Sequence, residues 1–121
     1  MPELYLRGED GYPTEEALEA LPLYRGTARQ LVNALEDGIK AYGGFTVRHT
    51  KDDYGHPVVD VSMATGGWSG NESIISALEK SFFWFAYWQS STRGGGYTFR
   101  VPADRWDEAM PDWSEIVKAR S

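Results

Sequence analysis

The chain contains no cysteine among its 121 residues, which excludes disulfide bonds, thiolate metal ligands and cysteine nucleophiles and fits a reducing cytosol. It also has no apolar run near the roughly 20 residues needed to cross a bilayer. The N-terminal residues include Glu3, Glu9 and Asp10 instead of the basic and then apolar pattern of a signal peptide. We therefore expect a soluble, cytoplasmic protein without membrane association.

Histidine and positive charge are also scarce. His49 and His56 are the only histidines, too few for a typical transition-metal site, so we expect neither a metal nor a cofactor. The formal net charge is −6, and residues 1–37 supply most of it, with eight acidic and three basic residues. Because an acidic protein repels the phosphate backbone, nucleic-acid binding is not expected. Ordinary solubility accounts for this charge, and the alternative is an acidic face that binds a basic surface on a protein partner.

Helix start signals occur at two threonines. Thr14 precedes Glu15 and Glu16, which suit the first turn of a helix because the helix dipole favours negative charge there. Thr27 precedes apolar residues at helical spacing that continue to about Tyr42. These patterns predict a short helix after Thr14 and a longer helix from Thr27 to Tyr42.

Alternation of apolar and polar residues predicts the strands. Residues 45–51 and 57–64 alternate in this way around a turn-forming segment, which predicts an antiparallel hairpin, and residues 97–101 predict a further strand. The length is that of one domain, so residues 1–121 are expected to fold as a unit. We predict the α+β class, with a small antiparallel sheet of three to four strands covered on one face by helices in two layers.

The aromatic residues concentrate in one segment, where six of the seven residues at 82–88 are aromatic. Aromatic residues favour strands, but no glycine or proline occurs within residues 71–93. We therefore favour one long helix from Ser69 to about Arg93, started by a capping box of Ser69 and Glu72, with a strand at 82–88 as the alternative. Either element is apolar on nearly all sides, so it must be buried or covered by a partner, and a homodimer would cover it.

No catalytic pattern stands out. No serine lies in a Gly-x-Ser-x-Gly elbow. The paired carboxylates Asp52 and Asp53 fall in a predicted turn, where solvated side chains lack the burial that would move their pKa values apart for acid–base catalysis. The glycines at 94–96 precede a strand and not a helix, so they fit a turn better than a phosphate-binding loop. These observations favour a protein that is not an enzyme.

A candidate ligand site arises if two glycine-containing loops, at 66–67 and 94–96, converge. Trp68 draws attention because a large ring in such a loop must be covered by its own domain or by a partner. Convergence of the loops would gather polar groups beside an aromatic wall, as ligand pockets require. The candidate binding residues are Trp68, Asn71, Glu72, Arg93 and Tyr97.

Three segments share a pattern: TGGWSGNE at 65–72, FW at 83–84 followed by Trp88, and STRGGGY at 91–97. Together they resemble a pattern in small uncharacterised proteins of tailed bacteriophages and their prophages, over about residues 60–101. In those proteins a second basic residue often replaces Thr92 and a histidine often replaces Gly96. The family has no established activity to transfer, so the resemblance implies a phage origin and not a mechanism.

The expected function is that of a small phage-type accessory protein that binds a host or phage protein non-covalently. Inhibition of a host complex would be one form of this function, by analogy with phage biology. The alternative is a small-molecule-binding domain or a small enzyme that uses the five candidate residues.

Overall fold

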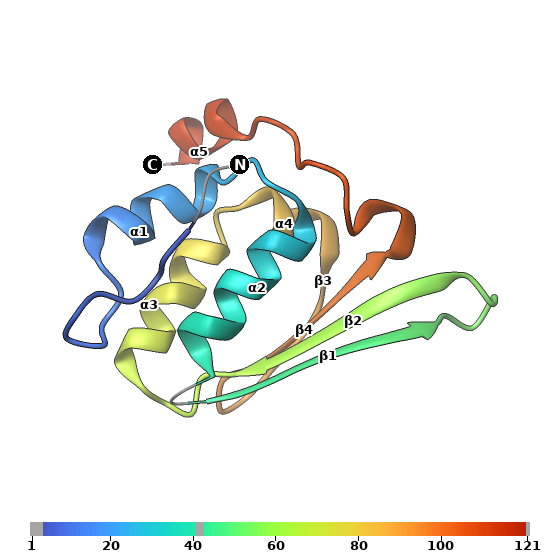
Figure 1. Ribbon diagram of the computed structural model, residues 1–121, viewed down its shortest axis with the longest axis horizontal. Coiled ribbons are helices and arrows are strands. Elements are labelled where there is room, and N and C mark those ends of the chain that lie inside the picture. The colour runs from blue at the N-terminus through green and yellow to red at the C-terminus, as the bar shows by residue number, and fades with distance from the viewer. Residues whose placement is uncertain (1–3, 41–42, 121) are drawn as a thin grey trace.

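The computed structural model describes residues 4–40 and 43–120, which form five α-helices, two short 3-10 helices and four strands (Figure 1). This content confirms the predicted α+β class. The elements in chain order are α1 (Glu15–Ala20), η1 (Leu21–Leu23), α2 (Ala28–Ile39), β1 (Gly44–Lys51), β2 (Pro57–Ala64), α3 (Ser69–Leu78), α4 (Phe82–Tyr87), β3 (Trp88–Thr92), β4 (Gly96–Pro102), η2 (Ala103–Arg105) and α5 (Ser114–Arg120).

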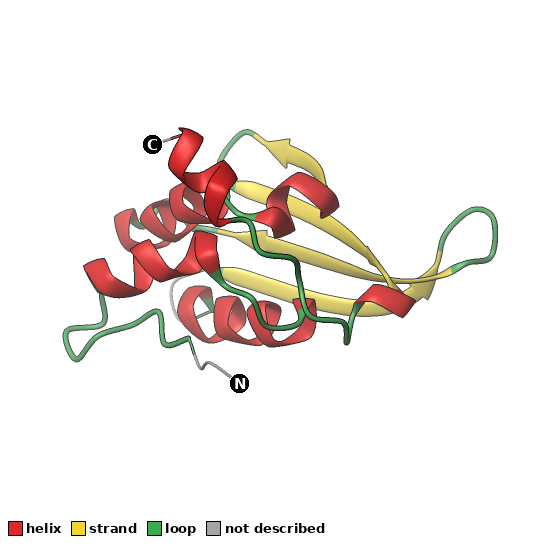
Figure 2. Cartoon of the chain, turned by 90° about the horizontal axis from the view of Figure 1, so that it is seen from above, coloured by secondary structure: helices red, strands yellow, loops and turns green. Residues whose placement is uncertain are grey.

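The four strands form one antiparallel sheet in the order β1-β2-β4-β3. The predicted hairpin is confirmed, with Phe45 opposite Met63 and Val47 opposite Val61. The helices gather on one side of the sheet, and no described element covers its other side (Figures 1 and 2). The sheet face toward the helices therefore carries the apolar residues, and the open face carries the polar ones.

The core lies between the sheet and the helices. The strands contribute Val59, Val61, Met63, Phe99 and Val101, and the helices contribute Leu31, Leu35, Ile39, Ile74, Leu78 and Phe83. Full burial of one such side chain contributes about 1.5–3 kcal/mol. This layer gives the small domain its main source of stability, and no disulfide adds to it because the chain has no cysteine.

Both threonine caps predicted from the sequence are present. The Thr14 hydroxyl accepts a hydrogen bond from the Ala17 N–H at 3.1 Å. Thr27 and Gln30 form a reciprocal capping box at the start of α2. This helix ends at Ile39, and the predicted end at Tyr42 lies outside the described residues.

The single helix predicted from Ser69 to Arg93 is wrong. The first helix ends at Leu78, and buried Ser81 starts α4 by accepting a hydrogen bond from the Trp84 N–H at 3.2 Å. The Ser81 hydroxyl also donates to the Leu78 carbonyl, which closes the turn between the two helices. This break directs Phe83 into the core against Phe99, with ring centroids 5.1 Å apart. The chain then leaves the helix and completes the sheet as β3.

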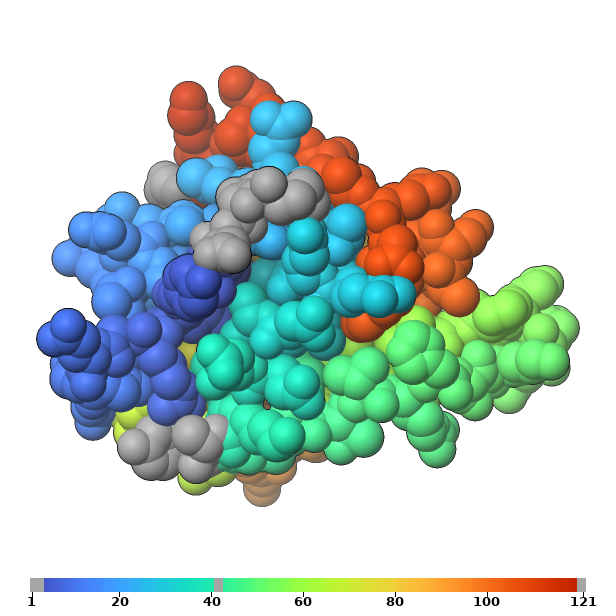
Figure 3. Space-filling view, in the orientation of Figure 1, coloured from blue at the N-terminus to red at the C-terminus, as the bar shows by residue number. Residues whose placement is uncertain are grey.

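The segment from η2 to α5 closes one end of the helical layer, where it lies against the start of α2 (Figure 3). The Met110 N–H donates to the Gly26 carbonyl at 3.0 Å, and the Arg29 N–H donates to the Trp106 carbonyl at 3.0 Å. An exposed ion pair at 2.7 Å joins Arg29 to Asp107. These contacts place the aromatic ring of Trp113 beside α4.

Candidate functional site

The two glycine-containing loops converge. The Thr65 N–H donates to the Gly95 carbonyl at 3.0 Å, so the turn after β2 is joined to the turn between β3 and β4. Gly95 has a φ of 93°, and a Cβ at this position would overlap the Thr65 hydroxyl. Glycine is therefore required at residue 95 both by the left-handed backbone and by the close approach.

Asn71 and Glu72 bind to this junction from the first turns of α3. Asn71 is fully buried, and its side-chain amide donates to the Thr65 carbonyl at 3.0 Å and to the Ile39 carbonyl at 3.3 Å. The exposed Glu72 carboxylate accepts a hydrogen bond from the Thr65 hydroxyl at 2.9 Å. The predicted capping box of Ser69 and Glu72 is therefore wrong: Trp68 is the N-cap residue, and Glu72 turns toward Thr65 instead.

Trp68 is covered by the N-terminal part of its own chain. Its half-buried ring packs on Tyr12 at a centroid distance of 4.9 Å, and the Arg7 guanidinium lies 5.3 Å from the ring centroid. An aromatic contact and a cation–π contact therefore attach the segment around residues 7–12 to the start of α3. Trp68 thus contributes to the internal packing of the domain.

The two remaining candidate residues lie further along the junction. Arg93 is exposed in the turn between β3 and β4, whereas Tyr97 lies on β4 and packs against Trp84 at 5.7 Å. Burial raises the pKa of the Tyr97 hydroxyl, and the negative charges of Glu72 and Glu79 add to this effect. The structure thus gathers Asn71, Glu72 and the Trp68 backbone around Thr65, while Tyr97 belongs to an aromatic cluster.

The aromatic residues of α4 lie on three sides of the helix. Phe83 and Tyr87 point into the core, and Trp84 stacks almost parallel to Trp88, at 6.2 Å and 15°. The third side holds Phe82 and Phe85, whose rings lie 5.5 Å and 5.2 Å from the Trp113 ring. We call Phe82, Phe85 and Trp113 the Phe85 patch, because Phe85 is 66% exposed.

A hollow of about 320 Å³ adjoins this patch and shares Phe82 with it. Its other lining residues are Tyr87, Pro102, Arg105, Glu108, Ala109, Met110 and Pro111. Most of these side chains are apolar, and the exposed ion pair of Arg105 with Glu108, at 3.1 Å, contributes the charges. An exposed ring beside a partly apolar hollow is an arrangement suited to contact with another protein.

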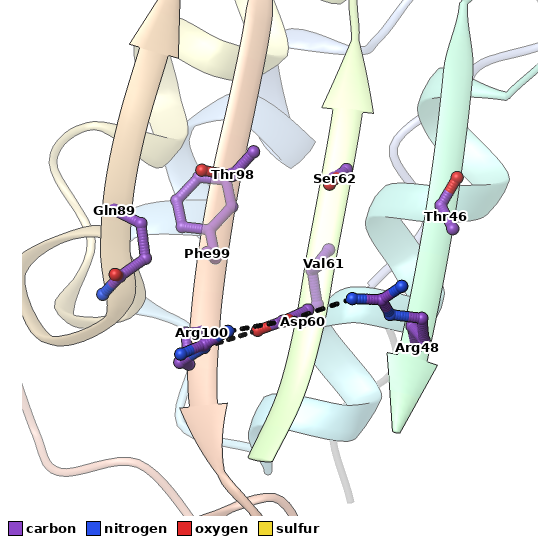
Figure 4. Close-up of a pocket in the computed structure, with 9 residues that line it drawn as sticks. All are labelled: Thr46, Arg48, Asp60, Val61, Ser62, Gln89, Thr98, Phe99 and Arg100. Carbon is purple, nitrogen blue, oxygen red and sulfur yellow. Dashed lines mark hydrogen bonds and ion pairs between the residues drawn. The ribbon is translucent and has the colours of Figure 1, made fainter. Parts of the chain in front are cut away.

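The open face of the sheet carries two polar rows that cross the strands (Figure 4). One row consists of Arg48, Asp60 and Arg100, and the other contains the hydroxyl residues Thr46, Ser62, Thr98 and Ser90. A shallow hollow of about 520 Å³ lies over these rows. The open face is therefore hydrophilic, which explains how it tolerates exposure without a second helical layer.

Asp60 is the centre of the charged row. Arg100 binds its carboxylate through two hydrogen bonds, at 2.7 and 3.0 Å, and Arg48 lies 4.0 Å from it. The hydrogen bonds from Arg100 lower the pKa of Asp60 below its ordinary value, and the charges of Arg100 and Arg48 act in the same direction. Asp60 is thus held as an anion, which suits a structural ion pair and not a proton donor.

Within residues 4–40 and 43–120, three or more His, Asp or Glu side chains nowhere converge closely enough to hold a metal ion. In the same part of the chain, no helix combines the length and apolar character that crossing a bilayer requires.

Comparisons of the chain with protein-family models, with curated proteins and with solved structures find no match.

Proposed function

We propose that this protein is a small accessory protein that binds a protein partner non-covalently through the Phe85 patch. The observation that carries the proposal is the 66% exposure of Phe85, which packs on Trp113 at the surface instead of turning into the core. Exposed aromatic clusters mark interaction sites, and aromatic residues supply many of the residues that dominate binding energy. A partner that covers this patch would remove the Phe85 ring from water.

The hollow next to the patch supports the same proposal. A projecting ring beside a depression lets the two surfaces interlock, because the partner can both cover Phe85 and insert an apolar side chain next to Phe82. The net charge of −6 favours a partner whose overall charge is positive. The resemblance to phage proteins supports a host or phage protein as the partner, in the host cytoplasm, and inhibition of a host complex is one consequence of such binding.

We favour this function over a ligand pocket at Trp68, Asn71, Glu72, Arg93 and Tyr97. The Asn71 amide already donates to two backbone carbonyls, and the Trp68 ring already packs on Tyr12. The Asn71 amide nitrogen and the Trp68 ring therefore already make contacts within the fold.

The test is capture of partners from a lysate of the natural host by the tagged protein, with and without nuclease. The informative variant is Phe85→Ser, and the matched control is Tyr54→Ser, because Tyr54 is 86% exposed at the distant tip of the β1–β2 hairpin. We expect a protein that remains bound after nuclease treatment, that is lost with Phe85→Ser and that is retained with Tyr54→Ser.

The affinity for that partner, once purified, gives a quantitative check. Burial of a phenylalanine side chain contributes about 1.5–3 kcal/mol, and about 1.4 kcal/mol corresponds to a factor of ten in affinity. Phe85→Ser should therefore weaken binding by a factor of roughly 10 to 100. Equal affinities of the wild type and Phe85→Ser would refute the proposed surface, and capture only without nuclease would indicate nucleic acid instead.

A further inference from the structure

The two edges of the sheet differ in how they are protected. An edge strand presents unpaired N–H and C=O groups, and natural proteins commonly guard such edges with charged side chains. β1 has this protection, since it carries Arg48, His49 and Lys51. All five residues of β3 are exposed, and none is charged. Figure 2 shows β3 at the margin of the sheet. β3 is therefore the edge without charged protection, and its regular part, Ser90–Thr92, is the part that can pair with another strand.

The charge distribution indicates what pairs with this edge. Residues 81–92 contain no charged residue, although a quarter of the whole chain is charged and its net charge is −6. β3 carries no charged side chain that would attract a basic partner. In a pair of identical β3 edges, both edges are uncharged and do not repel each other. Mutual repulsion between two acidic copies is therefore weakest where two β3 edges meet.

We propose that β3 of one chain pairs antiparallel with β3 of a second copy, which joins two sheets into one of eight strands. An antiparallel pair of identical strands is related by a two-fold axis, so both copies use the same surface and the assembly closes as a dimer. An axis perpendicular to the sheet keeps both helical layers on the same side. The Trp88 ring of each chain, which lies on that side with Trp84, then faces the far end of the other copy's β3.

Trp88 is suited to this contact. Its ring is 43% exposed, stacks on Trp84 and donates from Nε1 to the Ser91 hydroxyl at 2.8 Å. Because the ring is already held in place, its burial in a dimer costs little conformational entropy. The register shift between Trp88 and Ser90 leaves only Ser90–Thr92 as regular ladder. Burial of the Trp88 ring must therefore provide much of the binding energy.

This dimer does not depend on the proposed function. Phe85 faces Trp113 on one side of α4, whereas Trp84 faces Trp88 and the sheet edge on another. The Phe85 patch and the β3 edge are therefore separate surfaces. If the protein dimerises but captures no partner, the proposed function fails. If it captures a partner but remains a monomer, the proposed dimer fails.

Sedimentation velocity of the purified chain over a wide concentration range tests the proposal. The perturbing variant is Ser90→Lys, and the matched control is Thr46→Lys, because both residues are exposed hydroxyl residues on the open face of an edge strand. We expect the wild type and Thr46→Lys to shift toward the mass of two chains as concentration rises. Ser90→Lys should remain at the mass of one chain, with the circular dichroism of the wild type.

A second measurement locates the contact independently of substitution. Because successive amides of a strand point to opposite sides, hydrogen exchange of the amides within Ser90–Thr92 that point away from β4 should slow as protein concentration rises, while exchange of the β1 amides stays constant. A wild type that remains monomeric at millimolar concentration would overturn the proposal. So would a dimer that persists in Ser90→Lys, or one that is lost in Thr46→Lys.

Discussion

Replacement of Asn71 by alanine tests whether this residue holds the fold together. The fully buried side-chain amide donates to the carbonyls of Thr65 and Ile39, which joins α3 to the end of β2 and the end of α2. Asn71→Ala removes both donors, although the Thr65 carbonyl still accepts a hydrogen bond from the Trp68 N–H at 3.3 Å. The Ile39 carbonyl loses its bond from Asn71, and because a buried group without a partner costs about 1–3 kcal/mol, we expect the free energy of unfolding to fall by about 1–3 kcal/mol.

Urea unfolding followed by tryptophan fluorescence measures this loss. With a urea m-value of about 2 kcal/mol/M, the unfolding midpoint should fall by roughly 0.5–1.5 M. Asn33→Ala is the matched control, because Asn33 is exposed on α2. Its effect should stay within about 0.5 kcal/mol. An Asn71→Ala midpoint equal to that of the wild type would contradict a structural role for Asn71 and would make a ligand-binding role the better explanation.

Two further substitutions examine the junction of the loops and the charged row. Gly95→Ala should destabilise the fold more than Gly94→Ala, since both glycines have positive φ but only a Cβ at residue 95 would overlap Thr65; equal midpoints in urea would contradict the predicted close approach. Asp60→Asn should lower the free energy of unfolding near pH 7, because Arg100 depresses the pKa of Asp60 in the folded protein. That stabilisation is present above the unfolded pKa of about 3.9 and is lost as the pH falls through the folded pKa. The gap between wild type and Asp60→Asn should therefore narrow below about pH 4, and a gap that is constant from pH 2 to 7 would contradict this explanation.

Several elements were predictable because their signals are local. Thr27 and Gln30 satisfy each other's backbone donors within one turn, so the start of α2 needs no information from the rest of the chain. The hairpin of β1 and β2 follows from alternation with period two around a short turn. The overall α+β class follows from these elements together.

The segment after Trp68 was not predictable in the same way. Residues 82–88 are apolar on nearly all sides, so neither the helical nor the strand period stands out from the sequence. The choice is made by distant partners: Phe83 packs on Phe99, and β3 pairs with β4. The exposure of Phe85 follows from where α4 begins, and the turn of Glu72 toward Thr65 follows from the shape of the preceding loop.

The fold class, the caps of α1 and α2, the β1–β2 hairpin and the concentration of aromatic residues follow from the sequence alone. Each of these depends on contacts between residues close together in the chain. Long-range packing, in contrast, divides the aromatic segment into a helix and an edge strand. It also buries Asn71 at a junction and leaves Phe85 at the surface. These outcomes depend on which distant surfaces compete for the same side chains, and a one-dimensional pattern does not contain that information.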